Sequence, residues 1–267
     1  MSLYFRSLAS GSSGNSYLIK TDNTAVLVDT GTAGKHIIKG LEDSGLAPAD
    51  LSAVLLTHEH VDHVKSIRMI SKKAENAFVL GSRGTLKAIS DKIPRDRSKA
   101  VRAEMESFQV GDLLIRPFAL SHDAAEPLGY SFEADGRKAT IVTDTGFVTD
   151  GEYEQLVDSD LLVLEANHER NLLLMGRYPY PLKVRILGEQ GHISNDTCAD
   201  TLIRVIRERS RAGIPKVALA HLSKENNSPD IALMTIRNRL FEEALVEDRD
   251  YAMTVLMRDT AGEMIEV

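Results

Sequence analysis

Short runs of apolar and β-branched residues predict strands at 16–20, 25–29, 53–57, 113–120, 129–134, 138–144, 160–166, 216–222 and 253–258. Apolar residues at helical spacing predict helices near 33–44, 64–74, 82–91, 150–157, 194–211 and 229–243. The Asp135-Gly136 pair between two apolar runs is a hairpin signal. Hairpins followed by strand–helix alternation favour an α/β fold, in which helices cover mixed sheets.

Composition limits the class of protein. A chain of 267 residues with 43% hydrophobic residues suits one large α/β domain or two small ones. The sequence contains no internal repeat, low-complexity tract or linker, so residues 1–267 are interpreted as a single domain. No apolar run approaches the roughly 20 residues that span a bilayer, and the N-terminus lacks the apolar stretch of a secretory signal. The single cysteine, Cys198, excludes an intrachain disulfide and favours a cytoplasmic location.

The formal net charge of −7 argues against a protein that holds nucleic acid mainly by unspecific charge attraction, because such proteins are usually basic. It does not exclude an enzyme that acts on nucleic acid. Such an enzyme needs only a local positive groove, and bound divalent cations add charge that the residue count omits.

The segment LTHEHVDH places three histidines and one aspartate within six positions, between a predicted strand and a predicted helix. Open α/β sheets place their ligands at such strand-to-helix turns. His58 and His60 point the same way in an extended turn and are able to grip one metal ion, whereas Asp62 and His63 face a second position nearby. Mixed imidazole and carboxylate ligands suit Zn²⁺, Mn²⁺ or Fe²⁺. A solvated, histidine-rich surface turn is the plainer alternative.

The same context recurs at three later places, where a residue of ligand type ends an apolar run. RPFALSHD contains His122, KATIVTDTG contains Asp144 and KVALAHLS contains His221. A lone histidine is more often structural or solvated than a ligand. Three such positions beside an H-x-H-x-D-H turn favour a metal site, because four ligands in one turn cannot complete the coordination of two metal ions.

With these motifs the sequence resembles the metallo-β-lactamase superfamily over nearly its whole length. THEHVDH matches the signature motif, and the three later positions match the further ligand motifs in order. The resemblance implies a four-layer αβ/βα sandwich of two mixed sheets flanked by helices. It also implies two divalent ions per chain, Zn or Mn with Fe as an alternative. The implied ligands are His58, His60 and His122 for the first ion, and Asp62, His63 and His221 for the second, with Asp144 bridging both.

Two further segments resemble the YycJ/WalJ-like branch of the superfamily, namely LASGSSGNSYLI and EANHE…YPYPLKVRILGEQGHISN. Penicillin-cleaving members usually carry a cysteine ligand, whereas Cys198 lies outside every ligand motif. The branch implies a 5′-to-3′ exonuclease on DNA, so the implied partner is a nucleic acid and not a membrane. The GHIS segment also resembles transfer-RNA 3′-processing endonucleases, in which a histidine beside the metals assists phosphate cleavage, and His192 matches that histidine.

Several residues outside the ligand set are candidates for contact with substrate. They are Ser12, Ser13, Asn15, His168 and Ser194. The SGSSGNS loop is equally a flexible hairpin loop, and His168 is equally a cap of a surface helix. Ser194 or Asn195 is able to cap the helix that follows GHIS. Glu165 is a candidate to orient a ligand histidine. Lys183 and Arg185 either meet a substrate backbone or form an ordinary solvated helix face.

The expected chemistry is phosphodiester hydrolysis. Two metal ions lower the pKa of a shared water towards ~7, and the resulting hydroxide attacks phosphorus in line. Asp62 is expected to orient this nucleophile, and His192 to donate a proton to the leaving oxygen. Two alternatives remain: a thioester, lactone or small-molecule phosphodiester hydrolase on the same metals, and a non-catalytic metal-binding regulatory partner.

Overall fold

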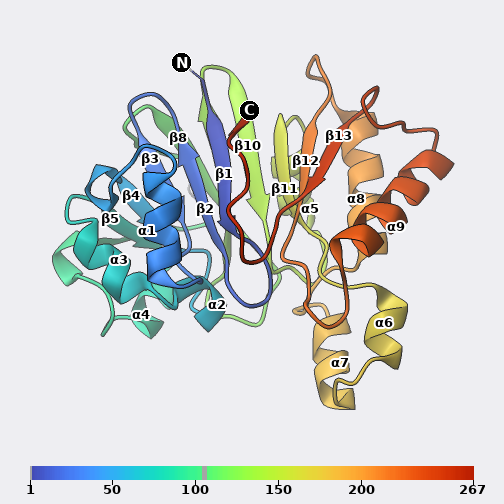
Figure 1. Ribbon diagram of the computed structural model, residues 1–267, viewed down its shortest axis with the longest axis horizontal. Helices are drawn as coiled ribbons and strands as arrows, with labels where there is room; N and C mark the ends of the chain where they lie inside the picture. Colours follow the sequence, from blue (N-terminus) through green and yellow to red (C-terminus); the bar gives the residue numbers. More distant parts are fainter. Residues whose placement is uncertain (1, 104–106) are drawn as a thin grey trace.

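The structure is a computed structural model that describes residues 2–103 and 107–267. Within these residues the strands form two seven-stranded sheets that lie side by side in the middle of the molecule (Figure 1). The first sheet has the order β14 (Ile265–Glu266), β1 (Tyr4–Ala9), β2 (Ser16–Lys20), β3 (Ala25–Val28), β4 (Ala53–Leu55), β5 (Phe78–Gly81) and β6 (Ser98–Ala100). The second has the order β13 (Ala252–Val255), β12 (Lys216–Ala220), β11 (Leu161–Glu165), β10 (Arg137–Val142), β9 (Leu128–Ala134), β8 (Leu113–Ala119) and β7 (Phe108–Val110).

Both sheets are mixed in the same way. In the first sheet β14, β1, β2 and β3 pair antiparallel, and β3, β4, β5 and β6 pair parallel. In the second sheet β7, β8, β9 and β10 pair antiparallel, and β10, β11, β12 and β13 pair parallel. The carboxyl ends of parallel strands lie together at one end of their sheet. The loops that follow β3 and β4 therefore gather at one end of the first sheet, and those that follow β10, β11 and β12 gather at one end of the second.

Helices cover the outer face of each sheet and complete four layers (Figure 1). The first sheet carries α1 (Gly34–Glu42), α2 (Val61–Val64), α3 (Ile67–Lys73) and α4 (Arg83–Ala88), with the short 3₁₀ helices Pro48–Asp50 and Arg95–Arg97 between strands. The second sheet carries α5 (Asp150–Leu156), α8 (Asn195–Glu208) and α9 (Pro229–Glu242). Two helices, α6 (Arg170–Met175) and α7 (Tyr180–Leu187), project from the body instead. Within the described residues no helix is long and apolar enough to cross a membrane.

The core follows from the two-residue alternation of the strands. In β11, Leu161 and Val163 pack in the apolar cluster between the two sheets, while Leu162 and Leu164 pack in the cluster beneath α5, α8 and α9. A third cluster fills the space between the first sheet and its helices. Because successive side chains point to opposite faces, a strand that is buried on both faces reads as a continuous apolar run.

The predicted four-layer αβ/βα sandwich of mixed sheets is confirmed. The hairpin at Asp135-Gly136 also forms, with φ of 49° and 73° at these two residues and antiparallel pairing of β9 with β10. The predicted helix 64–74 corresponds to α3, and Val64 ends a separate short helix, α2. Sequence periodicity did not predict β1, because polar side chains at Arg6 and Ser7 interrupt its apolar run. It also did not predict the short elements β5, β6, β7, β14, α6 and α7.

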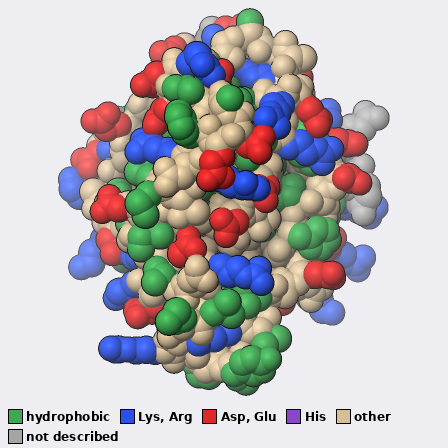
Figure 2. All heavy atoms as spheres, turned by 90° about the vertical axis from the view of Figure 1, so that its right-hand side faces the viewer, with side chains coloured by type: hydrophobic (Ala, Val, Ile, Leu, Met, Phe, Trp, Pro, Cys, Tyr) green, Lys and Arg blue, Asp and Glu red, His purple; other side chains and the backbone are tan. Residues whose placement is uncertain are grey.

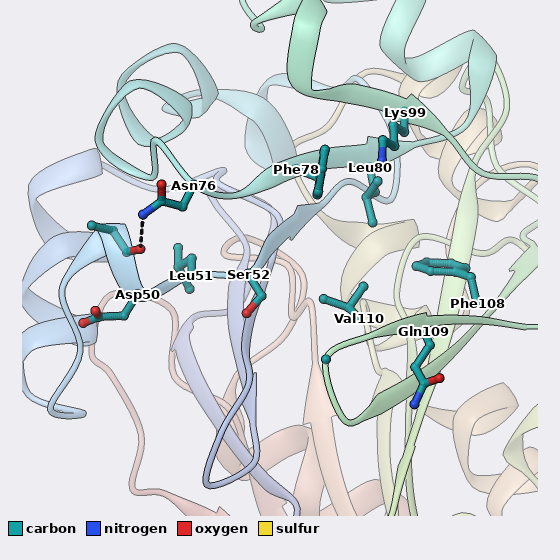
Figure 3. A pocket seen from close by; sticks show the side chains of 12 residues that line it. Asp50, Leu51, Ser52, Asn76, Phe78, Leu80, Lys99, Phe108, Gln109 and Val110 are labelled. Atoms are coloured by element: carbon teal, nitrogen blue, oxygen red, sulfur yellow. Dashed lines mark hydrogen bonds between the residues drawn. The ribbon is translucent and has the colours of Figure 1, made fainter.

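A pocket of about 550 Å³ opens where β4 and β5 begin (Figure 3). Phe78, Leu80, Phe108 and Val110 line it, and Lys99 Nζ lies 3.8 Å from the centre of the Phe78 ring. The lining is mainly apolar and contains no histidine. The histidine-rich turn follows the other end of β4, so this pocket and the candidate site lie at different ends of the strand.

Candidate metal centre and the residues around it

Residues of ligand type gather at the turns that follow β4, β8, β10 and β12. One group, whose ring nitrogens lie within 4.8 Å of one another, consists of His58, His60 and His122. A second group with the same spacing consists of Asp62, His63, Asp144 and His221. The structure therefore brings together all seven residues that the sequence nominates as ligands, and it takes them from both sheets.

Asp29, the first residue after β3, holds the histidine-rich turn in place. Its carboxylate accepts hydrogen bonds from the backbone N (2.9 Å) and Oγ1 (2.8 Å) of Thr57. His63 Nδ1 lies 2.7 Å from Asp29 Oδ2, which leaves Nε2 to face the ligand cluster. Sequence reasoning did not nominate Asp29, although AVLVD carries the same signal as the later ligands, an acidic residue at the end of an apolar run.

Two other segments press against the same turn. A Cβ added at Gly31 would lie 1.6 Å from the carbonyl oxygen of Asp62, so only glycine allows this approach. The backbone N of Thr30 donates to His63 O (2.7 Å), and that of Asn15 donates to Asp62 O (2.8 Å). Asn15 is fully buried, and its Nδ2 lies 3.1 Å from His63 Nε2. Asn15 therefore contacts the ligand turn and has no surface left for a substrate.

Three residues of the site have a left-handed backbone that non-glycine residues seldom adopt. The φ angles are 60° at Asp29, 65° at Asp144 and 54° at His221. His221 is fixed by hydrogen bonds from its N to Ser10 Oγ (3.0 Å) and from Asn167 Nδ2 to its O (3.0 Å). Hydrogen bonds to Asp29 and to His221 hold the strained conformation at these two residues.

The donor set fits divalent cations. Among the described residues, His58 Nε2, Asp144 Oδ2 and His221 Nδ1 are buried and have no hydrogen-bond partner. His221 Nδ1 lies only 3.0 Å from Asp144 Oδ2, and His63 Nε2 lies 3.1 Å from the same oxygen, but neither contact has the alignment of a hydrogen bond. Buried polar atoms are normally paired, so lone pairs that converge without pairing indicate a place for a cation.

The electrostatics of the cluster favour the metal-binding form at His58 and Asp144, and favour the protonated ring at His63. Burial and the neighbouring His63 lower the pKa of His58 well below its usual value, which keeps that ring neutral. Burial opposes the charge on Asp144, but His221 and His63 outweigh it and lower the pKa of this carboxyl well below its usual value. Burial also opposes the charge on His63, but the carboxylates of Asp144 and Asp29 outweigh the effect of burial and raise the pKa of His63. A cation would displace the proton that these carboxylates hold on His63.

His192 lies at the edge of the cluster and is paired with Glu165. Its Nδ1 is 2.7 Å from Glu165 Oε1, and its ring centre is 5.1 Å from that of His122 and 5.3 Å from that of His221. Burial alone would lower the pKa of His192, but Glu165 raises it to about 9. Glu165, His192, Asp144 and His221 also form a third group of converging ligand atoms. Geometry therefore allows His192 either to bind metal or to handle a proton.

Asp123 is a second residue that sequence reasoning missed, although it follows His122 directly. Its Oδ1 lies 3.5 Å from His122 Nε2 and 4.0 Å from His60 Nε2. Arg185 donates to Asp123 through Nη2 (3.0 Å) and through Nε. Burial opposes the charge on Asp123, but this guanidinium outweighs it and lowers the pKa of the carboxyl. Arg185 is thus bound to the edge of the ligand cluster.

The remaining candidates for substrate contact differ in exposure. Ser12 and Ser13 are exposed. Ser194 Oγ accepts a hydrogen bond from Thr197 N (3.2 Å) and caps α8, as the sequence predicts. His168 is buried, and among the described residues neither of its ring nitrogens has a hydrogen-bond partner. Burial lowers the pKa of His168 to about 4, so this ring is neutral.

The chain is similar to several known proteins. A family model described as a beta-lactamase superfamily domain matches residues 24–211. The exodeoxyribonuclease WalJ of Streptococcus pneumoniae serotype 2 is 35% identical over 266 residues, which cover 97% of this chain and 96% of that protein. The exodeoxyribonuclease YycJ of Bacillus anthracis is 35% identical over 245 residues, 91% of each chain. The metallo-β-lactamase fold protein YhfI of Bacillus subtilis superimposes with a TM-score of 0.72 at 14% identity, over the whole of both chains.

The chain belongs to the β-lactamase superfamily. The predicted resemblance to the YycJ/WalJ-like branch and the expectation of a hydrolase of this superfamily are confirmed by the two exodeoxyribonuclease relatives. The likeness to YhfI concerns the fold alone, because so few of the aligned residues are identical.

Proposed function

We propose that the chain is a metal-dependent phosphodiesterase that degrades DNA from the 5′ end. The observation that carries the proposal is the Glu165–His192 pair, which sets an imidazole at the edge of a buried cluster of histidine and aspartate side chains. The name exodeoxyribonuclease, borne by two relatives of 35% identity, supports DNA as the polymer and attack from an end. The resemblance to the YycJ/WalJ-like branch supports the 5′ end.

In this proposal His58, His60 and His122 hold one divalent ion, and Asp62, His63 and His221 hold the other. Asp144 is shared between them, because its two oxygens reach both halves of the cluster: Oδ1 lies 3.8 Å from His122 Nε2 and Oδ2 lies 3.0 Å from His221 Nδ1. When bound, two divalent ions supply an activated water at neutral pH and neutralise charge that develops on the phosphate.

The residues of the chain divide the remaining work. Asp62 is partly exposed, with 27% of its side chain accessible, so its free oxygen is able to orient the attacking water. His192 donates a proton to the leaving oxygen, since Glu165 occupies Nδ1 and leaves Nε2 for the substrate. Asn15 has a positioning role, because its amide groups bind the ligand turn. Ser12, Ser13 and Ser194 remain the proposed substrate contacts, whereas His168 is buried as a neutral ring without a hydrogen-bond partner among the described residues.

Because the proposed ligands come from both sheets, we treat residues 1–267 as one functional unit. Neither sheet with its helices contains a complete set of ligands: His58 to His63 belong to the first sheet, and His122, Asp144 and His221 to the second. A DNA substrate also agrees with the cytoplasmic location that the single cysteine favours.

The test combines metal analysis with digestion of end-labelled single- and double-stranded DNA and RNA, in Zn²⁺ and in Mn²⁺. We expect two divalent ions per chain and stepwise shortening of DNA from the 5′ end. Salt should weaken substrate binding, because phosphates are gripped electrostatically. If both nucleic acids stay intact with either metal while a thioester or lactone is cleaved, the phosphodiesterase proposal is wrong and the site serves the other hydrolase class.

A further inference from the structure

Residues 170–187, which comprise α6, α7 and the loop between them, form a projection that we call the arm. The arm carries four Arg and Lys residues and no Asp or Glu, in a chain that has 32 basic and 39 acidic residues. Six of the sixteen large hydrophobic side chains that are exposed in the described residues lie on it: Leu172, Leu174, Met175, Tyr180, Val184 and Leu187. Figure 2 shows hydrophobic and basic side chains together at the lower end of the molecule, where the arm lies.

A hollow of about 450 Å³ lies along the arm. Its lining residues are Asn171, Leu172, Met175, Gly176, Arg177, Tyr178 and Glu225. Arg177 is exposed and forms no ion pair with any described residue, so its guanidinium is available to a ligand. Lys183, in contrast, donates to the carbonyl oxygens of Leu174 and Gly176 (2.7 Å each) and ties α7 to the end of α6. The arm is therefore braced internally, while Arg177 and the six exposed apolar side chains face outward.

The base of the arm is hydrogen-bonded to residues of the candidate metal centre. The carbonyl oxygen of Ile186, in α7, accepts a hydrogen bond from His192 N (2.9 Å). Gly191 O, one residue before His192, lies 3.1 Å from His122 Nδ1 and orients that ring. Arg185 binds Asp123 beside the same cluster. The base of α7 is therefore bonded to the segment that carries His192, beside which the proposed reacting phosphate lies.

We propose that the arm binds an unpaired stretch of the nucleic acid strand that adjoins the reacting phosphodiester. This rests on the proposed function and names the surface that holds its polymer. Apolar and aromatic side chains offer platforms for base stacking, and Arg177 offers a contact for a phosphate. Tyr180, with 79% of its surface exposed, is the leading platform, and the hollow beside Tyr178 accepts a further base.

A second copy of the chain fits this surface less well. An interface with two-fold symmetry brings the same patch of each copy together, so two arms would place like charges against each other with no carboxylate of the arm to compensate. The phosphates of a nucleic acid strand supply the opposite charge, and its bases supply apolar faces.

The test measures the fluorescence anisotropy of a 3′-labelled single strand of DNA of about 20 nucleotides, which is longer than a typical binding site. Its phosphorothioate linkages resist cleavage during the titration. Tyr180→Ala should raise the Kd about tenfold, the scale of one lost stacking platform. Phe241→Ala is the matched control, because it removes an aromatic ring that is 71% exposed on α9. Circular dichroism and the melting temperature establish that both variants fold as the wild type does.

Each outcome separates this proposal from the proposed function. If Tyr180→Ala has an unchanged Kd and cleaves DNA normally, the proposal that the arm binds nucleic acid is wrong and the proposed nuclease activity stands. If Tyr180→Ala has a raised Kd but the wild-type protein cleaves no DNA, the proposal that the arm binds nucleic acid is supported and the proposed nuclease activity is wrong. If sedimentation shows a wild-type dimer that Tyr180→Ala converts to monomer, the arm is an interface between copies and the proposal is wrong.

Discussion

His63 and Tyr180 represent two neighbouring regions that are built in opposite ways. His63 is fully inaccessible, and its two ring nitrogens face Asp29 on one side and Asp144 on the other. Tyr180 has 79% of its surface exposed, on a projection whose apolar side chains face outward. Around His63 polar atoms are buried and converge, whereas on the arm apolar atoms are exposed and spread apart.

The contrast separates chemistry from recognition. Ligand atoms have to be held to within fractions of an ångström. Buried hydrogen bonds provide that precision, because Asp29 accepts from Thr57 and lies against His63 Nδ1, and Asn15 lies against His63 Nε2. A polymer of variable sequence instead needs a surface that accepts any base, which exposed apolar and aromatic groups provide. Substitutions in the buried region should therefore act on metal content and turnover, and those on the arm should act on affinity.

The largest effect is expected at the shared ligand. Asp144→Ala should lower turnover by more than about 10³-fold, because removal of its carboxylate takes a ligand from both proposed ions. Metal analysis of the purified variant should show loss of metal in parallel. Asp230→Ala, an exposed carboxylate at the start of α9, is the control and should keep both properties. Full turnover in Asp144→Ala would contradict the shared role.

The next effect separates the proton donor from the ligand. His192→Ala should keep two metal ions per chain and lose about 10²-fold or more in the chemical step, the scale of a lost acid–base group. His221→Ala should lose the second ion instead. The measurement is metal content beside single-turnover kinetics, with His36→Ala on α1 as a histidine outside the cluster. If the His192 variant loses metal and the His221 variant keeps it, the two roles are reversed.

A smaller effect tests the support beneath the ligands. Asp29→Ala should weaken metal affinity about 10- to 100-fold, because His63 loses the carboxylate that orients its ring. Titration with a competing chelator gives this affinity directly, and Asp22→Ala, an exposed carboxylate in the β2–β3 hairpin, is the control. Equal affinities in the two variants would mean that the protein holds the His63 ring without Asp29.

The smallest effect is expected on the arm. Arg177→Ala should reduce the slope of log Kd against log salt concentration by about 0.7, the contribution of one neutralised phosphate on a single strand. Metal content should stay at the wild-type value, which is the property that separates the arm from the buried cluster. Arg116→Ala, an exposed arginine on β8, should leave the slope as it is. A slope that both variants lower equally would indicate a general charge effect and not a contact at Arg177.

The sequence by itself determined the fold class and nominated the seven ligands. Both depend on local patterns: continuous apolar runs indicate strands that are buried on both faces, and a ligand-type residue after such a run lies at the edge of a sheet. The same pattern was present at Asp29, between AVLV and Thr30, but a single aspartate at a strand end does not reveal that a histidine 34 positions later will bind it.

Only the tertiary structure decided which of these residues support others and which face solvent. Asn15 and Ser12 belong to one loop motif, yet Asn15 is buried against His63 and Ser12 is exposed. The arm, similarly, was not predicted as two helices, and the order of its residues does not reveal that its apolar side chains are exposed. Periodicity reports the order of apolar and polar positions along the chain, but burial depends on which distant segments pack against them.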